Sequence, residues 1–387
     1  MKKQNFRTDH AHDQKFWSGM QKGVHHAVQN VSLTFAIPAL FSAILLGLFL
    51  WRRYIRWNVQ CTSKNRLDGK TVIITGGNSG LGRAAGYELA RRGAKVILAC
   101  RHLKKADAVA RQIIKKTGNE DVHASELDLG SLQSIQEFAT HIKEKERHLN
   151  ILINNAGYMG PKQSTEDGYE RCFGVNYLGH FYLTNLLKDL LAKCAPSRII
   201  NVTSDSYVKG KIEYDDLPMK SYNIYKAYAR SKLAQMHFTV EAHRLWFPDV
   251  VMSFAVQPGW VHTDLMRNWP GMSGNLLRMF AEFMFKTPEE GCQTIVHCAV
   301  ADSLKEYSGR LFENCRVIKM KDEVANMEAC RKLWKESLQL CGLDPDIHFI
   351  VDEHKECEDG HETLEHSGES QGKGSSEARS RKTKVTS

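Results

Sequence analysis

The chain has 387 residues, of which 42% are hydrophobic and 25% charged, and its formal net charge is +9. A chain of this size can bury one large core of about 250 to 300 residues, with appendages at its ends. Its basic residues are spread along the sequence without interleaved aromatic residues, which argues against binding to nucleic acid. The ten cysteines show neither a C-x-x-C pair nor the spacing of metal ligands, so we expect no metal site and no need for disulfides.

An apolar run lies near the N-terminus. Residues 1–30 are polar and of mixed charge, and Val31–Trp51 then runs for 21 residues without a charged side chain. At about 1.5 Å per residue, a helix of this length spans the roughly 30 Å hydrocarbon core of a bilayer. The run starts too late and is too long for a cleaved signal peptide. A buried core helix is the alternative, but nothing nearby is apolar enough to cover it. The sequence therefore predicts a single-pass transmembrane anchor over residues 31–51.

The charges beside this anchor indicate its orientation. Arg52, Arg53 and Arg56 follow the run directly, whereas the basic residues before it are partly offset by Asp9 and Asp13. Because a denser basic flank favours the cytosolic side of a membrane, we expect the rest of the chain to face the cytosol. The endoplasmic reticulum is the membrane that we expect to hold it.

After the anchor, short apolar segments alternate with longer amphipathic ones. Ser131–Lys145 is typical of the latter, with apolar residues at helical spacing behind a serine cap. This alternation predicts an α/β fold, a Rossmann-like doubly wound parallel sheet in a single domain over residues 67–345 that closes with a helix at Val324–Leu340. The expected strands are Thr71–Thr75, Lys95–Ala99, Val122–Leu127, Ile151–Ile153, Ile199–Val202, Val250–Val256 and Arg310–Phe312.

A glycine-rich turn follows the first expected strand and opens a helix. Within Thr71–Gly93 the sequence reads T-V-I-I-T-G-G-N-S-G-L-G-R-A-A-G. Unpaired backbone N–H groups at such a helix N-terminus bind a pyrophosphate, and glycine lets the phosphates approach. Taken alone the pattern is weak evidence, since such turns often only close a loop. The expected dinucleotide contacts here are Gly76, Asn78, Ser79, Gly80, Leu81 and Gly82.

The ends of the second and third strands bear on the choice of cofactor. Arg101 stands about 20 residues past the glycine turn, where NAD-binding forms carry a carboxylate for the ribose hydroxyls. Its guanidinium could instead pair with a 2′-phosphate, or it could be an ordinary surface charge. Asp128 could accept from the adenine amino group, or simply precede a helix. We expect NADP(H) as the preferred cofactor and leave NAD(H) open, because Ser79 is not a second basic group.

Six motifs in order resemble the short-chain dehydrogenase/reductase family, over residues 67 to about 341, or roughly 70% of the chain. The anchor, A-C-R, G-V-N-Y-L-G-H-F and A-Y-A-R-S-K-L-A resemble its retinol dehydrogenase-like branch. G-Y-E-R-C-F-G-V-N-Y-L-G-H-F-Y-L-T-N-L-L and F-K-T-P-E-E-G are similar to the X-linked member of this family associated with polyprenol oxidation. The six motifs are Thr75–Gly82, Asn154-Asn-Ala-Gly157, Asn176 in G-V-N-Y, Ser204 after I-I-N-V-T, Tyr228-Ala-Arg-Ser-Lys232, and Pro258-Gly259 with Thr263.

A tyrosine and a lysine supply the expected catalytic base. Hydride transfer at a carbinol carbon needs a group that removes or supplies the hydroxyl proton, and a free tyrosine with pKa near 10 is too weak a base at pH 7. Lys232 lies one helical turn after Tyr228, where its ammonium stabilises the phenolate. Tyr222 and Lys226 have the same spacing. We prefer Tyr228 because S-K-L-A continues into an amphipathic helix.

The family resemblance implies the remaining roles. Ser204 would bind the substrate oxygen beside Tyr228, and strand alternation turns only one of Thr203 and Ser204 toward the site. Asn176 would hold a water that relays protons from Lys232, which also reaches the nicotinamide ribose. The further cofactor contacts are Asn155, Ala156, Gly157, Pro258, Gly259, Val261 and Thr263.

Two flanking segments complete the picture. Leu265–Phe285 is rich in Met and Phe, which suits either a lid over a lipophilic substrate arriving from the bilayer or packing against the sheet or the partner of a homodimer. Residues 352–387 are charged, then rich in Gly and Ser, and are predicted to be disordered.

Two functions are compatible with these residues. The first is a membrane-anchored NADP(H)-dependent oxidoreductase that interconverts a lipophilic alcohol of retinol, polyprenol or sterol type and its aldehyde or ketone. The alternative is a dinucleotide-binding regulatory or scaffolding protein without turnover. The set of Asn176, Ser204, Tyr228 and Lys232 favours the enzyme, because a pure binder has no need of a phenolate.

Overall fold

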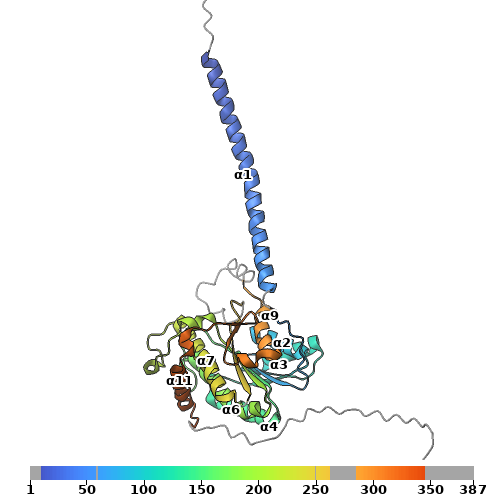
Figure 1. Cartoon of the computed structure of the whole chain (residues 1–387), viewed down its shortest axis with the longest axis vertical. Coiled ribbons are helices and arrows are strands. Elements are labelled where there is room, and N and C mark those ends of the chain that lie inside the picture. Colours follow the sequence, from blue (N-terminus) through green and yellow to red (C-terminus); the bar gives the residue numbers. More distant parts are fainter. Residues whose placement is uncertain (1–9, 58–59, 249, 262–284, 345–387) are drawn as a thin grey trace, which may run out of the picture. The chain divides into compact units, whose positions relative to one another are not determined.

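The computed structural model describes residues 10–57, 60–248, 250–261 and 285–344. Within them, the core is a sheet flanked by helices (Figure 1). The sheet has eight strands in the order β3-β2-β1-β4-β5-β6-β7-β8. Strands β1 to β7 pair in parallel, and β8 lies antiparallel to β7. The prediction of a Rossmann-like sheet is confirmed. The strands are β1 Thr71–Thr75, β2 Lys95–Cys100, β3 Val122–Glu126, β4 Ile151–Asn154, β5 Ser197–Val202, β6 Val251–Val256, β7 Leu311–Glu313 and β8 Arg316–Ile318.

The predicted strand ends fall within two residues of the observed ones. The first strand coincides with β1, whose five residues are all buried, as expected for a central strand covered on both faces. The largest difference is at β5, which begins at Ser197, where the prediction began at Ile199. The edge strand β8 was not predicted. Its first two residues are exposed, so it carries no apolar run that could reveal it.

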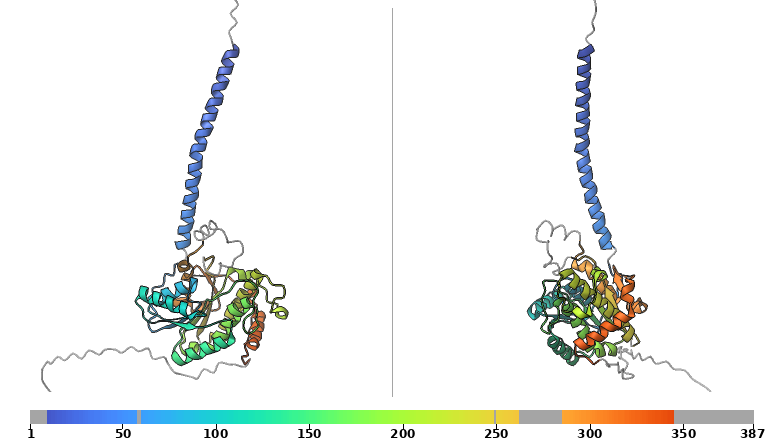
Figure 2. Two further views of the ribbon diagram at one scale, coloured as in Figure 1. Left: turned by 180° about the vertical axis from the view of Figure 1, so that it is seen from behind. Right: turned by 90° about the vertical axis from the view of Figure 1, so that its left-hand side faces the viewer.

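Helices cover both faces of this sheet (Figure 2). Alternate side chains of the strands point to opposite faces, so Ile74 packs with α2, α3 and α10, whereas Ile73 packs with α4, α6 and α7. The helices of the domain are α2 Gly80–Arg91, α3 Leu103–Thr117, α4 Leu132–Lys145, α5 Arg171–Phe173, the π-helical turn η1 Gly174–Leu178, α6 Gly179–Lys193, α7 Ile224–Trp246, α9 Pro288–Gly291, α10 Gln293–Val300 and α11 Met327–Leu340. Short 3-10 turns lie at Asp205–Lys209, Tyr214–Asp216, Asp302–Tyr307 and Asp322–Ala325.

The predicted anchor is part of one long helix. Helix α1 runs without interruption from His10 to Trp57, through Pro38, and so extends into the segment expected only to be polar. Its stretch Phe35–Tyr54 is long and apolar enough to cross a membrane, and none of it is buried. The alternative of a buried core helix therefore does not fit. This stretch begins four residues after the predicted start at Val31 and ends three after Trp51, so that it takes in Arg52 and Arg53.

The predicted closing helix is divided in two. A 3-10 turn at Asp322–Ala325 precedes α11, and the side chain of Asn326 caps α11 by accepting from the N–H groups of Glu328 and Ala329. Trp334 of α11 lies edge-on to Phe181 of α6, with ring centroids 4.9 Å apart. Helix α11 thus completes the core over α6 and α7. The predicted lid at Leu265–Phe285, apart from Phe285, and the predicted tail over residues 352–387 lie outside the described residues.

Candidate active site

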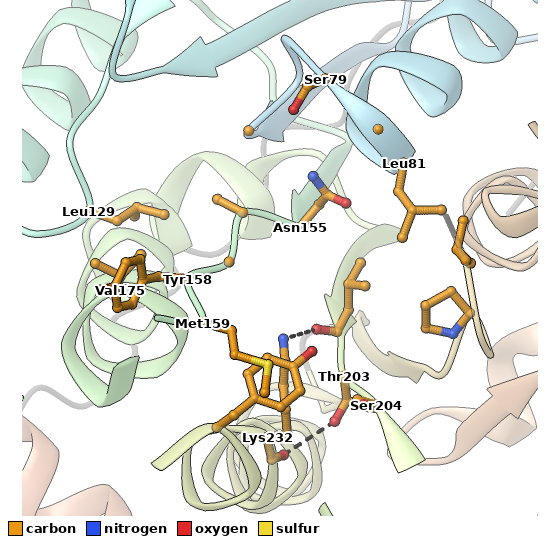
Figure 3. A pocket seen from close by; sticks show the side chains of 18 of the residues that line it. Ser79, Leu81, Leu129, Asn155, Tyr158, Met159, Val175, Thr203, Ser204 and Lys232 are labelled. Atoms are coloured by element: carbon orange, nitrogen blue, oxygen red, sulfur yellow. Dashed lines mark hydrogen bonds between the residues drawn. The ribbon is translucent and has the colours of Figure 1, made fainter. Parts of the chain in front are cut away.

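A cavity of about 940 Å³ opens where β1, β2, β4, β5 and β6 end. Figure 3 shows Ser79 at one end of it, Lys232 and Ser204 at the other, and Asn155 between them. Among the described residues, every predicted site residue lines this cavity except Gly82 and Asn176. Thr263 lies outside the described residues. Predicted residues from five of the six motifs therefore meet at one place.

The glycine turn leaves the N-terminus of α2 open to the cavity. Gly76 and Gly80 have φ of +67° and +48°, in the left-handed region that favours glycine. Ser79 stands at the N-cap of α2, but its side chain makes no capping hydrogen bond. The first N–H groups of the helix therefore remain available, which fits a pyrophosphate at this end.

Gly82 does not line the cavity, and its role lies in the packing of α2 against the turn. A Cβ atom there would lie 2.5 Å from the carbonyl oxygen of Gly76 and 2.6 Å from the Asn155 amide nitrogen. No side chain fits between the helix and the turn. Gly82 therefore brings α2 close to the ends of β1 and β4, and so positions the N–H groups that face the cavity.

The ends of β1 and β4 are joined by Thr75 and Asn155. The Thr75 hydroxyl accepts from the backbone N–H groups of Asn155 and Ala156 at 2.9 and 3.0 Å. In return the Asn155 side chain donates to the Thr75 carbonyl at 2.8 Å. The Asn155 amide nitrogen is thus used within the protein, and the Asn155–Gly157 loop borders the cavity next to it.

His180 extends this network and was missed by the sequence reasoning. It is buried on α6, with Nε2 2.8 Å from the Thr75 hydroxyl and Nδ1 2.8 Å from the Asn176 carbonyl oxygen. A carbonyl only accepts, so Nδ1 carries the proton and Nε2 accepts from Thr75. Burial lowers the pKa of His180 to about 4, which keeps the ring neutral. Its place in G-V-N-Y-L-G-H-F was the available signal.

Asn176 supports the site from behind and does not line the cavity. It lies fully buried in the π-helical turn η1, a geometry common at functional sites. Its Oδ1 accepts from Tyr158 N–H at 2.6 Å, and its Nδ2 donates to the Tyr158 carbonyl at 3.0 Å and to Ser231 Oγ at 2.9 Å. These hydrogen bonds engage both polar atoms of the side chain, and Asn176 thereby fixes the loop after β4. Its expected role in holding a relay water stays a prediction.

Tyr228, Lys232 and Ser204 lie together at the far end of the cavity. The Lys232 amine is 5.5 Å from the centre of the Tyr228 ring. Burial lowers the pKa of Lys232 to about 8. Burial also raises the pKa of Tyr228, Cys172 adds to this, and a hydrogen bond with Ser204 opposes it. Thr203 is 2% exposed and its hydroxyl donates to the Lys232 carbonyl, whereas Ser204 is half-buried.

The competing pair Tyr222 and Lys226 does not form a site. Helix α7 begins at Ile224, so Tyr222 lies before it, and the two side chains do not share a helical face. The Tyr222 hydroxyl donates to the Gly160 carbonyl at 2.7 Å. Tyr222 thus fastens two loops, and its hydroxyl is turned to the protein.

Arg101 and Asp128 border the end of the cavity that the glycine turn occupies. Arg101 follows β2 and is exposed, which leaves its guanidinium accessible to a ligand. The Asp128 carboxylate accepts from the Gly130 N–H at 2.9 Å and so already shapes its own loop. Both of the readings that the sequence left open for Asp128 are compatible with this geometry.

A buried lysine supports the loop after β6. Lys286 donates from Nζ to the Pro258 carbonyl and to Asn314 Oδ1, both at 2.8 Å, and its backbone N–H donates to the Trp260 carbonyl. Burial lowers the pKa of its amine. Gly259 has φ of +78° and leaves room for this amine, which lies 2.8 Å from where a Cβ would be. In the sequence, Lys286 stands in F-K-T-P-E-E-G, one of the stretches that carry the family resemblance.

Comparison with known proteins decides the family. The short chain dehydrogenase profile matches residues 70–273, more than half of the chain. The chain belongs to the short-chain dehydrogenase family. Mouse retinol dehydrogenase 13 is 43% identical to it over 319 residues, which cover 80% of this chain and 95% of the relative. Human retinol dehydrogenase 11 is 42% identical over 288 residues, 74% of this chain and 90% of the relative.

Solved structures agree on the fold. An uncharacterised protein from Mycobacterium paratuberculosis has a TM-score of 0.58 and 30% identity, covering 74% of this chain and 98% of that one. A short-chain dehydrogenase from Shigella flexneri complexed with NADP has a TM-score of 0.53 and 22% identity, covering 66% and 100%. This short-chain dehydrogenase is therefore a dinucleotide-dependent oxidoreductase that acts on alcohols, in the retinol dehydrogenase-like branch.

Proposed function

We propose that this enzyme interconverts a lipophilic alcohol and its aldehyde or ketone, with NADP(H) as the preferred cofactor, and that Ser204, Tyr228 and Lys232 carry the proton chemistry. The observation that carries the proposal is the meeting of these three side chains in one cavity with the open N-terminus of α2. A nicotinamide cofactor bound there would supply or accept the hydride.

The residues of the chain divide the remaining work. The Ser204 hydroxyl holds the substrate oxygen, and the Tyr228 phenol gives a proton to that oxygen in reduction or takes one in oxidation. The Lys232 ammonium, 5.5 Å from the Tyr228 ring, favours the phenolate electrostatically. The N–H groups at the start of α2 hold the pyrophosphate. Asn176, through Tyr158, keeps the loop after β4 in place between these two ends.

The wall of the cavity near Tyr228 supports a lipophilic substrate. Tyr158, Met159, Tyr225 and Trp260 all line it. Trp260 is 59% exposed and Tyr225 46% exposed, and large apolar side chains left open at a cavity mouth favour apolar ligands. Retinol, polyprenol and sterol alcohols are the substrate classes that we propose, and the retinol dehydrogenases among the relatives favour the first.

The proposed preference for NADP(H) rests on Arg101, and the proposed cellular location rests on helix α1. Arg101 lies at the end of β2 and carries a positive charge. NAD-binding forms have a carboxylate at this position. The apolar stretch Phe35–Tyr54 would anchor the enzyme in the endoplasmic reticulum membrane, with the catalytic domain in the cytosol. NADPH-rich cytosol would then favour reduction. A homodimer in the membrane is also part of this proposal.

Replacing Tyr228 with Phe tests the proposal. Membranes that hold the enzyme are assayed with retinal, a polyprenal and a steroid ketone, each with NADPH and with NADH. We expect Tyr228→Phe to lower turnover at least 1,000-fold, on the order of the loss of an acid-base group, with NADPH affinity nearly unchanged.

Tyr222→Phe is the matched control, because it removes the hydroxyl of the competing pair, and it should retain most of the turnover. Undiminished turnover in Tyr228→Phe would refute the assignment. A wild-type protein that binds NADPH but converts no substrate would favour the alternative of a binding protein.

A further inference from the structure

The amine of Lys232 rests on two acceptors, one of which belongs to no predicted motif. Nζ donates to the Val202 carbonyl at 2.8 Å and to Gln235 Oε1 at 2.9 Å. Lys232 is 3% exposed and Gln235 1% exposed. An ammonium has three N–H groups, so one remains for the cavity, which Lys232 lines (Figure 3).

Gln235 contributes little else with its side chain. It lies three residues after Lys232 on α7, so the two side chains are neighbours on one helical face. Its Nε2 is buried and has no hydrogen-bond partner among the described residues. The ammonium can only donate, which fixes the amide with its oxygen toward Lys232. Burying an amide with unpaired N–H groups costs folding stability. Among the described residues, the hydrogen bond from Lys232 is the one bond that this amide makes.

We propose that Gln235 is a positioning residue for the reaction, whose amide oxygen holds the Lys232 ammonium beside Tyr228 and favours its charged form. This inference rests on the roles proposed above for Tyr228 and Lys232. It assigns the two hydrogen bonds of the amine different tasks: the Val202 carbonyl ties it to the end of β5, and Gln235 ties it to its own helix.

No other described side chain accepts a hydrogen bond from the Lys232 ammonium. The titratable groups that face Lys232 are Cys172 on α5, His180 on α6 and Tyr228 on its own helix. Burial raises the pKa of Cys172 to about 12 and lowers that of His180 to about 4, so both are neutral near pH 7. The phenol of Tyr228 is neutral as well, because burial raises its pKa. Asp205 acts on Tyr228, and the protein-side partners of the ammonium are the two neutral oxygens.

Two substitutions at Gln235 should move the pH profile in opposite directions. Burial already lowers the pKa of Lys232 to about 8. Gln235→Met keeps the size and removes the acceptor, so the ammonium loses its proton more easily. Gln235→Glu places a carboxylate there and holds the proton more tightly. The measurement is kcat/KM for NADPH in aldehyde reduction against pH, which reports the free enzyme.

We expect the alkaline limb to move down by about one pH unit in Gln235→Met and up by about one in Gln235→Glu, a tenfold change in the proton equilibrium. Thr239→Val is the control, since it removes a buried hydroxyl one turn further along α7 that bonds the Gln235 backbone carbonyl. Its limb should stay in place. NADPH binding and thermal unfolding, measured for each variant, show that it is folded, and the Glu variant carries the test if the Met variant is not.

An alkaline limb that stays in place in folded Gln235 variants would overturn the inference. Lys232→Met separates this failure from that of the proposed function. If Lys232→Met removes turnover while the Gln235 limbs do not move, only the role of Gln235 is wrong. If Lys232→Met keeps wild-type turnover, the assignment of the catalytic lysine fails, and the inference about Gln235 fails with it.

Discussion

At the scale of single residues, the site depends on buried groups that never face the cavity. Thr75, His180 and Asn176 form a chain of hydrogen bonds from the end of β1 to the π-helical turn η1. Asn176 then holds Tyr158 through both its N–H and its carbonyl. The residues that line the cavity are positioned by this chain, and its members keep their polar atoms paired, as buried polar groups must.

The histidine in this chain predicts a pH dependence of stability. The pKa of His180 is about 4 in the folded protein, because of burial, and about 6.5 in an unfolded chain. As pH falls from 6.5 to 4, the unfolded state takes up a proton that the folded state does not, so stability falls through this window and then levels off. Between pH 7.5 and pH 5, the titration of His180 lowers the free energy of unfolding by about 2 kcal/mol.

The variant His180→Gln removes the contribution of His180 to this loss of stability. Urea unfolding of the detergent-solubilised enzyme at pH 7.5 and 5 should show a drop that is smaller in the variant by about 2 kcal/mol. His237, His243 and His297, whose pKa values are also lowered by burial, act equally in both proteins. Equal drops in wild type and variant would contradict the buried, neutral state of His180.

At the scale of elements, helix α2 must approach the ends of β1 and β4 closely. Gly82 permits this, because a Cβ there would lie 2.5 Å from the Gly76 carbonyl oxygen, an atom of the backbone that cannot turn away. We expect Gly82→Ala to displace the start of α2 and weaken NADPH binding more than tenfold, since the N–H groups that we propose to hold the pyrophosphate move with it. Binding is measured by quenching of protein fluorescence.

Gly86→Ala is the matched control on the same helix. A Cβ at Gly86 meets a terminal methyl carbon of Leu98 at 3.1 Å, and this flexible side chain can shift. Its NADPH affinity should therefore stay within about threefold of wild type, helped by the higher helix propensity of alanine. Equal losses in both variants would mean that α2 tolerates no added carbon anywhere, and that the close approach at Gly82 has no special part in binding.

At the scale of the whole molecule, the segment after α1 belongs to the catalytic domain. The Asn65 side chain donates to the Val300 carbonyl and the Asn65 carbonyl accepts from Arg92, both at 2.8 Å. Cys61 N–H donates to Gln293 Oε1 at 3.1 Å. Arg92 is 8% exposed, so without Asn65 its guanidinium would lose a partner in a buried place, at a cost of about 1 to 3 kcal/mol.

Two truncations test whether the segment between α1 and β1 supports the fold of the domain. Removal of residues 1–57 takes away the apolar stretch Phe35–Tyr54 and should release the enzyme from membranes in a carbonate wash, with its unfolding temperature retained. Removal of residues 1–66 should release it too, but lower the unfolding temperature by several degrees. Equal unfolding temperatures for the two shortened chains would show that residues 58–66 do not support the fold. A shortened chain that still sediments with membranes would show that α1 is not what holds it there.

Local patterns in the sequence determined much of this protein. The strand β1, the glycine turn, the apolar stretch of α1 and the Tyr228–Lys232 spacing were all readable, because each depends on backbone geometry or periodicity within a few residues. The edge strand β8 was not, since it pairs with β7 through the backbone and has exposed side chains.

Only the tertiary structure decided which distant groups meet. Thr75 and His180 are 105 residues apart in sequence, Lys286 and Pro258 are 28 apart, and Asn176 reaches back 18 residues to Tyr158. Hydrogen bonds of this kind follow from the path of the chain through the sheet, and no periodicity records them. Even for Gln235, only three residues from Lys232, the sequence does not indicate the proposed role. That role follows from the hydrogen bond to Lys232 and from the burial of an amide whose Nε2 has no partner among the described residues.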